Sequence, residues 1–309
     1  MSELAEMADN YLALRRSLGY KLDEAGRLLP RFVAYLDAIG AETVTIENAL
    51  EWSQQPNASS TSTVWEHRMR VTRGFARHLV GIDPRTQVPP AGLSSCPQRR
   101  RTPYIYSPTD VATLRAQARL MIPSPLRAAT FDTVIGLLAV TGMRIGEVIA
   151  IERSDIDWSE DVLMVRESKF GKSRLVPVHP TTTAALTAYA QERDRRQPTP
   201  KSPSFFVSTV GTRLAYNDVA KTFHKMVDCS GVAAGSSVRP RLHDLRHTFA
   251  VYTLVRWYRE GHDVHARLPW LSTYLGHREP RYTYWYLTAI PELLALAASR
   301  LEAAKEAKS

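Results

Sequence analysis

The chain has 309 residues, of which 44% are hydrophobic, so it is long enough for two domains that each bury a core. Forty Lys and Arg against 31 Asp and Glu give a formal net charge of +9, which suits a polyanionic partner, either nucleic acid or an anionic membrane surface. The first residues lack the features of a secretory signal, and the longest apolar run, VIGLLAV at residues 134–140, is too short to span a bilayer. We therefore expect a cytoplasmic protein without a membrane partner.

The two cysteines, Cys96 and Cys229, form neither a metal-ligand spacing nor a disulfide framework, which fits a reducing compartment. The first part of the chain carries apolar residues at helical spacing, and Gly19, Gly40 and Gly81 stand where three of the helices would stop. Thr45 and Thr61 are suitable N-caps. We predict a helical domain over residues 1–84, with helices near residues 4–19, 25–40, 45–55 and 61–81.

Residues 85–107 are rich in proline and polar residues, and they contain the run QRRR. This composition cannot hold a continuous helix and predicts an interdomain linker. The run makes Arg99, Arg100 and Arg101 candidates for contact with phosphates, although a merely solvated tether explains them equally well.

Helical periodicity returns after residue 107 and predicts a second domain over residues 108–309. Two β-rich runs within residues 161–179 flank a turn that contains Gly171, which predicts a β-hairpin inside this domain. Further helices are expected near residues 109–121, 126–151, 181–196, 217–231, 242–261, 268–276 and 291–307.

Basic residues lie next to predicted helix ends or turns at three places in this second domain. In TGMRIGEV a helix is expected to stop at Thr141 and Gly142, so that Arg144 lies at the start of the next helix, where it either binds an anion or pairs with Glu147. The hairpin turn offers Lys169, Lys172 and Arg174, although exposed turns are often basic.

In RLHDLRHTFAVY, His243 and Arg246 share one face of a helix. His247 follows His243 at i, i+4, which raises the alternative of a metal site, but no Glu or Cys follows at a zinc-site spacing. The stretch LGHREPRYTYWYL then places Tyr282, Tyr284 and Tyr286 at alternate positions. Spacing alone leaves open whether one of these phenols is chemically active.

The order of these motifs, TGMRIGE, a lysine hairpin, HDLRHTFA, LGH and TYWY, resembles the tyrosine recombinase family, also called the phage integrase family. The similarity covers residues 107–298, and the helical region before the linker is similar to the family's core-binding domain. The resemblance implies a mainly α fold with a small antiparallel β-sheet. A core-binding domain and a catalytic domain would then close around DNA as a two-domain clamp.

The resemblance also implies which residues act. Tyr286 matches the nucleophile that forms a 3′-phosphotyrosine, and His243 would take its proton. Arg144 and Arg246 would hold the phosphate oxygens, and His277 would donate a hydrogen bond to the phosphate. Lys169 would protonate the leaving 5′-oxygen, with Lys172 as the alternative if the hairpin register is shifted. Glu147 would orient the catalytic side chains without contacting the DNA itself. Tyr282 and Tyr284 are expected to pack, with Tyr282 as the fallback nucleophile.

The implied partners are double-stranded DNA recombination sites, a tetramer of the chain on DNA and, in some systems, a second recombinase. No metal and no nucleotide or other cofactor is expected, because the matched residues include no carboxylate cluster for magnesium. Such an enzyme would be associated with the nucleoid. Three alternatives are a type IB topoisomerase, a DNA-binding accessory protein without catalysis, and a metal-dependent hydrolase built on His243, Asp244 and His247.

Overall fold

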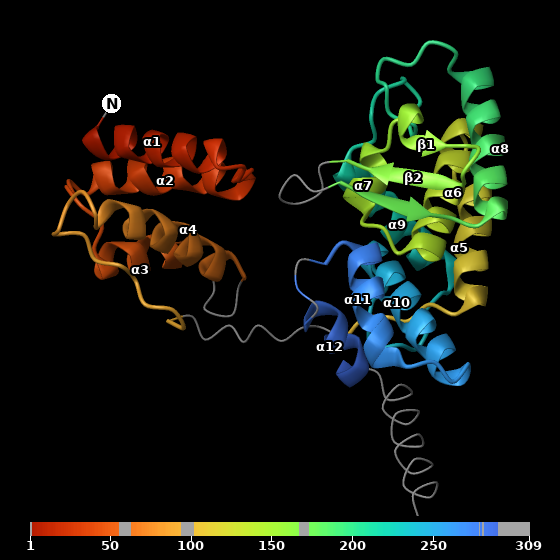
Figure 1. The fold of residues 1–309 in the computed structure, drawn as a ribbon. Helices are drawn as coiled ribbons and strands as arrows, with labels where there is room; N and C mark the ends of the chain where they lie inside the picture. Colours follow the sequence, from red (N-terminus) through yellow and green to blue (C-terminus); the bar gives the residue numbers. More distant parts are fainter. Residues whose placement is uncertain are drawn as a thin grey trace, which may run out of the picture. The chain divides into compact units, whose positions relative to one another are not determined.

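The computed structural model divides into two compact units, residues 1–100 and residues 101–309, each described by itself. The structure describes residues 2–55, 63–93, 102–166, 173–277, 279 and 281–289, with the backbone alone for 281 and 287–289. The expected fold class is confirmed, because helices account for most of the described chain and a single small antiparallel sheet accompanies them (Figure 1). None of the described helices combines the length and the apolar character needed to cross a lipid bilayer.

The N-terminal unit is built from four helices around one apolar core. Leu29, Phe32 and Phe75 are fully buried, and the ring of Phe32 lies 5.0 Å from that of Trp52. Thr45 caps the third helix as predicted, since its hydroxyl accepts the N–H of Asn48 at 3.2 Å. Thr61 lies outside the described residues. The helices are α1 (Glu3–Ser17), α2 (Asp23–Ala38), α3 (Ile46–Gln54) and α4 (Thr63–Leu79).

Both ends of the predicted linker belong to folded parts of the chain. Arg73 donates hydrogen bonds of 2.8 Å to the carbonyls of Pro89 and Pro90, which hold that segment on the N-terminal unit. Tyr106 is fully buried in the other unit, and its backbone N–H donates to Thr248 Oγ1 at 3.0 Å. Proline and polar composition therefore predicts the absence of helix here, but packing and hydrogen bonds decide which residues are fixed.

The main core of the C-terminal unit lies around helix α6, which is rich in apolar residues and against which α5, α8 and α10 pack. Asp132 on α6 binds Arg115 and Arg119 of α5, so its buried charge is compensated. The helices of this part are α5 (Pro108–Met121), α6 (Pro125–Thr141), α7 (Ile145–Ala150), the 3₁₀ helix η1 (Arg153–Asp155), α8 (Pro180–Arg196) and α9 (Tyr216–Ser230).

The predicted hairpin is present as two strands of a three-stranded antiparallel sheet in the order β1–β2–β3. Leu163 pairs with Val176, and both are fully buried, so this face of the sheet rests on the core. Gly171 and the turn around it lie outside the described residues. The strands are β1 (Ile156–Asp157), β2 (Val162–Val165) and β3 (Arg174–Pro177).

The last three described helices form a second apolar cluster, drawn in blue in Figure 1. They are α10 (Leu242–Arg259), α11 (Val264–Leu275) and α12 (Arg281–Ala289). Helix α11 begins earlier than its apolar pattern predicts, because Asp263 caps it by accepting the N–H of Ala266 at 3.1 Å. Helix α10 packs against both α6 and α11, and α11 also contacts β3. The predicted helix at 291–307 lies outside the described residues.

Candidate active site

Arg144 occupies the sharp turn between two helices. Helix α6 ends at Thr141, and Gly142 follows in the left-handed conformation with φ of 60°. A side chain there would meet Phe249 at 2.6 Å, so the turn requires glycine. Arg144 is the N-cap of α7, and its Nη2 donates to the carbonyl of Gly276 at 3.0 Å. The arginine thus links the start of α7 to the end of α11.

Arg246 is a buried cation at the meeting point of three helices. It extends from α10 with only 2% of its surface exposed, and its Nη1 donates to the carbonyl of Gly142 at 2.8 Å. Its Nη2 donates to the carbonyl of Leu275 at 2.5 Å. Both carbonyls lie at the C-terminal ends of helices, where partial negative charge favours a cation. These contacts fix the position of the guanidinium.

Glu147 binds two arginines from different parts of the sequence. It accepts Nη1 of Arg144 at 2.7 Å and Nη2 of Arg174 at 2.8 Å. Burial alone would raise the pKa of Glu147, but the hydrogen bonds and charge of Arg174, followed by those of Arg144, lower this pKa to about 2. Glu147 is therefore an anion in the folded protein and holds Arg144 in place.

Arg174 stands in a different position from the exposed one that its place in the hairpin suggests. Its side chain is 11% exposed, and it donates to the carbonyl of Tyr274 at 2.9 Å in addition to Glu147. The guanidinium thus joins β3 to α7 and to the end of α11. Antiparallel pairing and helix packing bring an acidic partner next to Arg174 inside the protein, and its contact with DNA stays a prediction.

Positive charge accumulates around the first histidine. Burial, followed by the charge of Arg246 with a contribution from Arg144, lowers the pKa of His243 to about 4. Burial and the neighbouring charge of Arg144 also lower the pKa of Arg246 to about 10. No carboxylate among the described residues forms an ion pair with Arg246. The site therefore holds cationic charge that Glu147 balances only in part.

His277 and Tyr286 lie next to each other, and His277 is close enough to Arg246 and Arg144 to feel their charge. His277 follows the end of α11, and its Nδ1 lies 2.8 Å from the hydroxyl of Thr283. Its ring stacks on that of Tyr286, with centroids 6.3 Å apart and an interplanar angle of 24°. Burial, then the charges of Arg246 and Arg144, lower the pKa of His277 to about 3. The imidazole is accordingly neutral at pH 7.

The three alternating tyrosines of helix α12 differ in how far their side chains are exposed. Tyr286 is 2% exposed and belongs to the apolar cluster of α10, α11 and α12. Tyr282 and Tyr284 are 36% and 43% exposed, and Tyr284 lies near His265. Because the segment is a helix, Tyr284 projects from a different face from Tyr286. The ring of His277 lies 6.3 Å from those of both Tyr282 and Tyr286, but of the three phenols that of Tyr286 alone is buried.

His247 also belongs to the site, although the sequence suggested it only as a metal ligand together with His243. Its Nδ1 lies 3.1 Å from the hydroxyl oxygen of Tyr286, and its ring lies 4.8 Å from that of His243 in an edge-to-face arrangement. The i, i+4 spacing from His243 was the available signal, since it places both imidazoles on one face of α10. In the part of the chain that is described, no group of three or more His, Cys, Asp and Glu has the arrangement to hold a metal ion.

The remaining predicted site residues belong to two segments that the structure does not describe. Lys169 and Lys172 of the hairpin turn, and Arg99, Arg100 and Arg101 of the linker, lie outside the described residues. The structure therefore brings together Arg144, Glu147, His243, Arg246, His277 and Tyr286 from the predicted set, and it adds His247.

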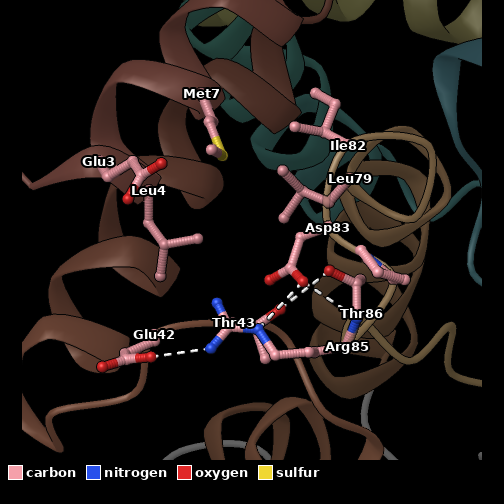
Figure 2. Close-up of a pocket in the computed structure, with 11 residues that line it drawn as sticks. Glu3, Leu4, Met7, Glu42, Thr43, Leu79, Ile82, Asp83, Arg85 and Thr86 are labelled. Carbon is pink, nitrogen blue, oxygen red and sulfur yellow. Dashed lines mark hydrogen bonds and ion pairs between the residues drawn. The ribbon is translucent and has the colours of Figure 1, made fainter.

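A pocket in the N-terminal unit has a different character (Figure 2). Its lining includes Leu4 and Ile82, and its cation, Arg85, is bound by two carboxylates. Glu42 accepts Arg85 Nη1 at 2.9 Å, and Asp83 accepts Arg85 Nε at 3.1 Å. This pocket thus lacks the uncompensated cation that distinguishes the site in the C-terminal unit.

The site thus contains an arginine pair, two histidines of lowered pKa and an enclosed tyrosine, and comparison with known proteins identifies the class as that of the tyrosine recombinases. Residues 111–292 match the sequence profile described as the phage integrase family. The protein named "Putative integrase/recombinase y4rB" of Sinorhizobium fredii is 42% identical over 98% of each chain. Tyrosine recombinase XerD of Bradyrhizobium diazoefficiens is 29% identical, covering 88% of this chain and 87% of its own. The chain belongs to the phage integrase family.

Solved structures show the same fold. The Tn1549 transposon integrase, in complex with transposon right end DNA, aligns with a TM-score of 0.67 at 16% identity over 96% of this chain and 98% of its own. A lambda integrase tetramer bound to a Holliday junction aligns with a TM-score of 0.60 at 18% identity, covering 92% of this chain and 76% of its own. As a member of the phage integrase family, the chain is an enzyme of the class that breaks and rejoins DNA strands.

Proposed function

We propose that this protein is a site-specific DNA recombinase that cuts and rejoins DNA through a 3′-phosphotyrosine intermediate. The observation that carries the proposal is the buried guanidinium of Arg246, which forms no ion pair with a carboxylate of the described residues and lies beside Arg144 and near Tyr286. A buried cation without a partner anion is costly, and a phosphodiester would supply the missing negative charge. DNA partners and assembly in fours are further supported by the DNA-bound complexes and the tetramer that the structural relatives form.

The reaction is a pair of phosphoryl transfers. Tyr286 Oη attacks a phosphorus of the DNA backbone, a P–O bond to the tyrosine forms, and the bond to the 5′-oxygen breaks. The 5′-oxygen leaves with a proton, for which Lys169 is our candidate donor. Attack by a 5′-hydroxyl of another strand then reverses these events and releases the tyrosine. The energy of the broken bond is conserved in the phosphotyrosine, so no nucleotide cofactor is needed.

The arginines would stabilise the charge that develops at phosphorus. Each guanidinium offers N–H donors in a fixed fork, and both are already oriented by backbone carbonyls, so little reorganisation is needed when the phosphate binds. His277 would donate a hydrogen bond from Nε2, since Nδ1 is already engaged with Thr283. Because cationic side chains supply this stabilisation, we propose that the reaction requires no metal ion.

The phenol still has to lose its proton. With an ordinary phenol pKa of about 10, roughly one tyrosine in a thousand is ionised at pH 7, which corresponds to about 4 kcal/mol. The positive charge of Arg246 and Arg144 would favour the phenolate, and a neighbouring base would accept the proton. Tyr286 is therefore the nucleophile that the surroundings best suit.

The test uses a nicked DNA duplex that carries the sequence the protein selects from a random pool. After cleavage the short fragment beside the nick diffuses away and traps the covalent adduct. Wild-type protein should form the adduct in the presence of EDTA, and Tyr286→Phe should form none. Tyr282→Phe and Tyr284→Phe are the matched controls and should retain it. An adduct with Tyr286→Phe would refute the nucleophile, and loss of the wild-type adduct in EDTA would refute the metal-free reaction.

A further inference from the structure

The second histidine of helix α10 lies within hydrogen-bond distance of the proposed nucleophile. His247 Nδ1 lies 3.1 Å from Tyr286 Oη, within the range over which a base takes a proton directly. The two rings meet at 64° with centroids 5.4 Å apart, so the imidazole edge is directed at the phenol. When Nδ1 accepts the hydroxyl proton, the ring proton of the neutral imidazole resides on Nε2.

His243, to which the family resemblance assigns this task, is arranged differently. Its ring lies edge-to-face against His247 at 4.8 Å, one helical turn away on α10. Burial and the charge of Arg246 lower its pKa to about 4, which makes it a weak base in the DNA-free protein. His243 is better placed to donate a hydrogen bond to a bound phosphate than to receive the proton of Tyr286.

We propose that His247 is a further catalytic residue, the general base that takes the Tyr286 proton during strand cleavage and returns it during rejoining. This inference rests on the proposed function, because it requires Tyr286 to be the nucleophile. In cleavage the Tyr286 O–H bond breaks, a proton is added to His247 Nδ1, and the phenol oxygen bonds to phosphorus. The 5′-oxygen leaves with a proton from the separate acid. In rejoining, Nδ1 gives its proton back to the tyrosine oxygen, so protons and electrons balance over the cycle.

The charges that face His247 explain why this transfer would depend on DNA. His243 faces it from the same helix, and Trp285 and Tyr286 face it from α12. Arg246 is the adjacent residue on α10, and His277 after α11 couples electrostatically to His247. A phosphate held by the arginines would add negative charge near this histidine and would stabilise an imidazolium that forms on it. Binding of the substrate would thus make His247 a competent base.

The experiment separates proton transfer from simple orientation. In His247→Asn the amide oxygen occupies the region of Nδ1 and still accepts a hydrogen bond, but it does not take up a proton near neutral pH. Adduct formation on the nicked duplex should fall at least about 100-fold, and the acid limb of its pH profile should disappear. His265→Asn, an exposed histidine near Tyr284, is the matched control and should cleave at the wild-type rate. Gel shift and thermal melting check DNA binding and folding.

A fluorinated tyrosine at position 286 sharpens the readout. Because its phenol is more acidic, the nucleophile needs less help from a base, so the deficit of His247→Asn should shrink about tenfold relative to the unmodified tyrosine. If His247 only orients or packs, His247→Asn will cleave near the wild-type rate, or fluorination will speed both proteins equally. Either result overturns the general base and leaves the proposed function intact. An adduct with Tyr286→Phe would overturn both.

A second measurement applies to the unaltered protein and decides the matter even if His247→Asn does not fold. In the trapped adduct the proton from Tyr286 should remain on His247, so ¹⁵N resonances of this histidine should show both ring nitrogens protonated at neutral pH. The DNA-bound complex before cleavage should show one. A neutral His247 in the adduct would contradict the proposal.

Discussion

Two arginines, one in each unit, show how differently a folded chain treats the same charge. Arg85 in the N-terminal unit is exposed and paired with Asp83 and Glu42, whose hydrogen bonds raise its pKa (Figure 2). Arg246 in the C-terminal unit is buried on backbone carbonyls beside another arginine, and burial followed by the charge of Arg144 lowers its pKa to about 10. The first is neutralised within the protein, whereas the second retains its charge for a ligand. A binding site for an anion is therefore distinguished from an ordinary basic surface by whether carboxylates of the protein neutralise its arginines, more than by the number of basic residues.

The largest expected effect is on catalysis. Arg246→Ala removes a preoriented donor from the developing charge at phosphorus, and adduct formation should fall about 10³-fold. Arg85→Ala removes a cation that carboxylates already neutralise, and the rate should stay at the wild-type value. The rates are measured on the nicked duplex in the same buffer. Equal rates for the two folded variants would show that the uncompensated charge has no part in cleavage.

A smaller effect is expected on stability when the shared carboxylate is neutralised. Glu147→Gln leaves the buried guanidinium of Arg174 and that of Arg144 without their anion, and it should lower the free energy of unfolding of the C-terminal unit by about 4 kcal/mol. Glu42→Gln acts on an exposed pair and should change the stability of its own unit little. Denaturant titration followed by hydrogen exchange separates the two units. A stable Glu147→Gln protein would mean that Arg144 and Arg174 find other partners.

Acid should weaken the C-terminal unit through its buried histidines. His243 has a pKa of about 4 in the folded protein and about 6.5 when unfolded, so the unfolded chain binds more protons between these values. Stability is then complete above pH 6.5 and falls as the pH drops toward 4, by about 3 kcal/mol for this residue. His243→Asn should flatten the decline of melting temperature in this window, whereas His265→Asn should leave it unchanged. A profile that His243→Asn does not alter would contradict the assigned shift.

Glu147 also weakens the folded state as the pH falls, but in a lower window. Its pKa of about 2 lies below that of an ordinary glutamate, so its contribution is present above about pH 4.5 and is lost as the pH falls toward 2. The window of His243 therefore lies above pH 4 and that of Glu147 mainly below it, and His277, with a pKa of about 3, contributes across both. In Glu147→Gln the decline below pH 4 should become shallower, while the decline between 6.5 and 4 should remain.

The smallest effect is expected from a simple anion. Inorganic phosphate at about ten times its dissociation constant should stabilise the C-terminal unit by about 1 kcal/mol, because it binds the folded state alone. The N-terminal unit should not respond, and Arg246→Ala should remove the response of the C-terminal unit. The rise in melting temperature of each unit measures this. A response of equal size in both units would remove the distinction between Arg246 and Arg85.

Much of the site could be predicted because its residues stand in local motifs. Arg144 falls at a helix break marked by Gly142, and a glycine with φ of 60° is needed there whatever surrounds it. The hairpin and most helices follow from alternating or helical apolar patterns. Arg174 shows the limit, since its place near a turn indicates exposure, and only the packing of β3 against α11 buries it on Glu147. A charged residue's partner cannot be inferred from its neighbours in sequence when that partner arrives from another element.

The tyrosine stretch divides in the same way between sequence and structure. The sequence by itself determined the helices that carry the arginines and histidines, and its resemblance to the family predicts that Tyr286 is the nucleophile. Only the tertiary structure decided which imidazole meets the phenol, because His243 and His247 share a helix face and differ by one turn. The packing of α12 on α10 selects His247, and the burial of Arg246 on two helix ends leaves its charge for a phosphate. Both outcomes depend on distances between segments remote in the chain, which local sequence patterns do not encode.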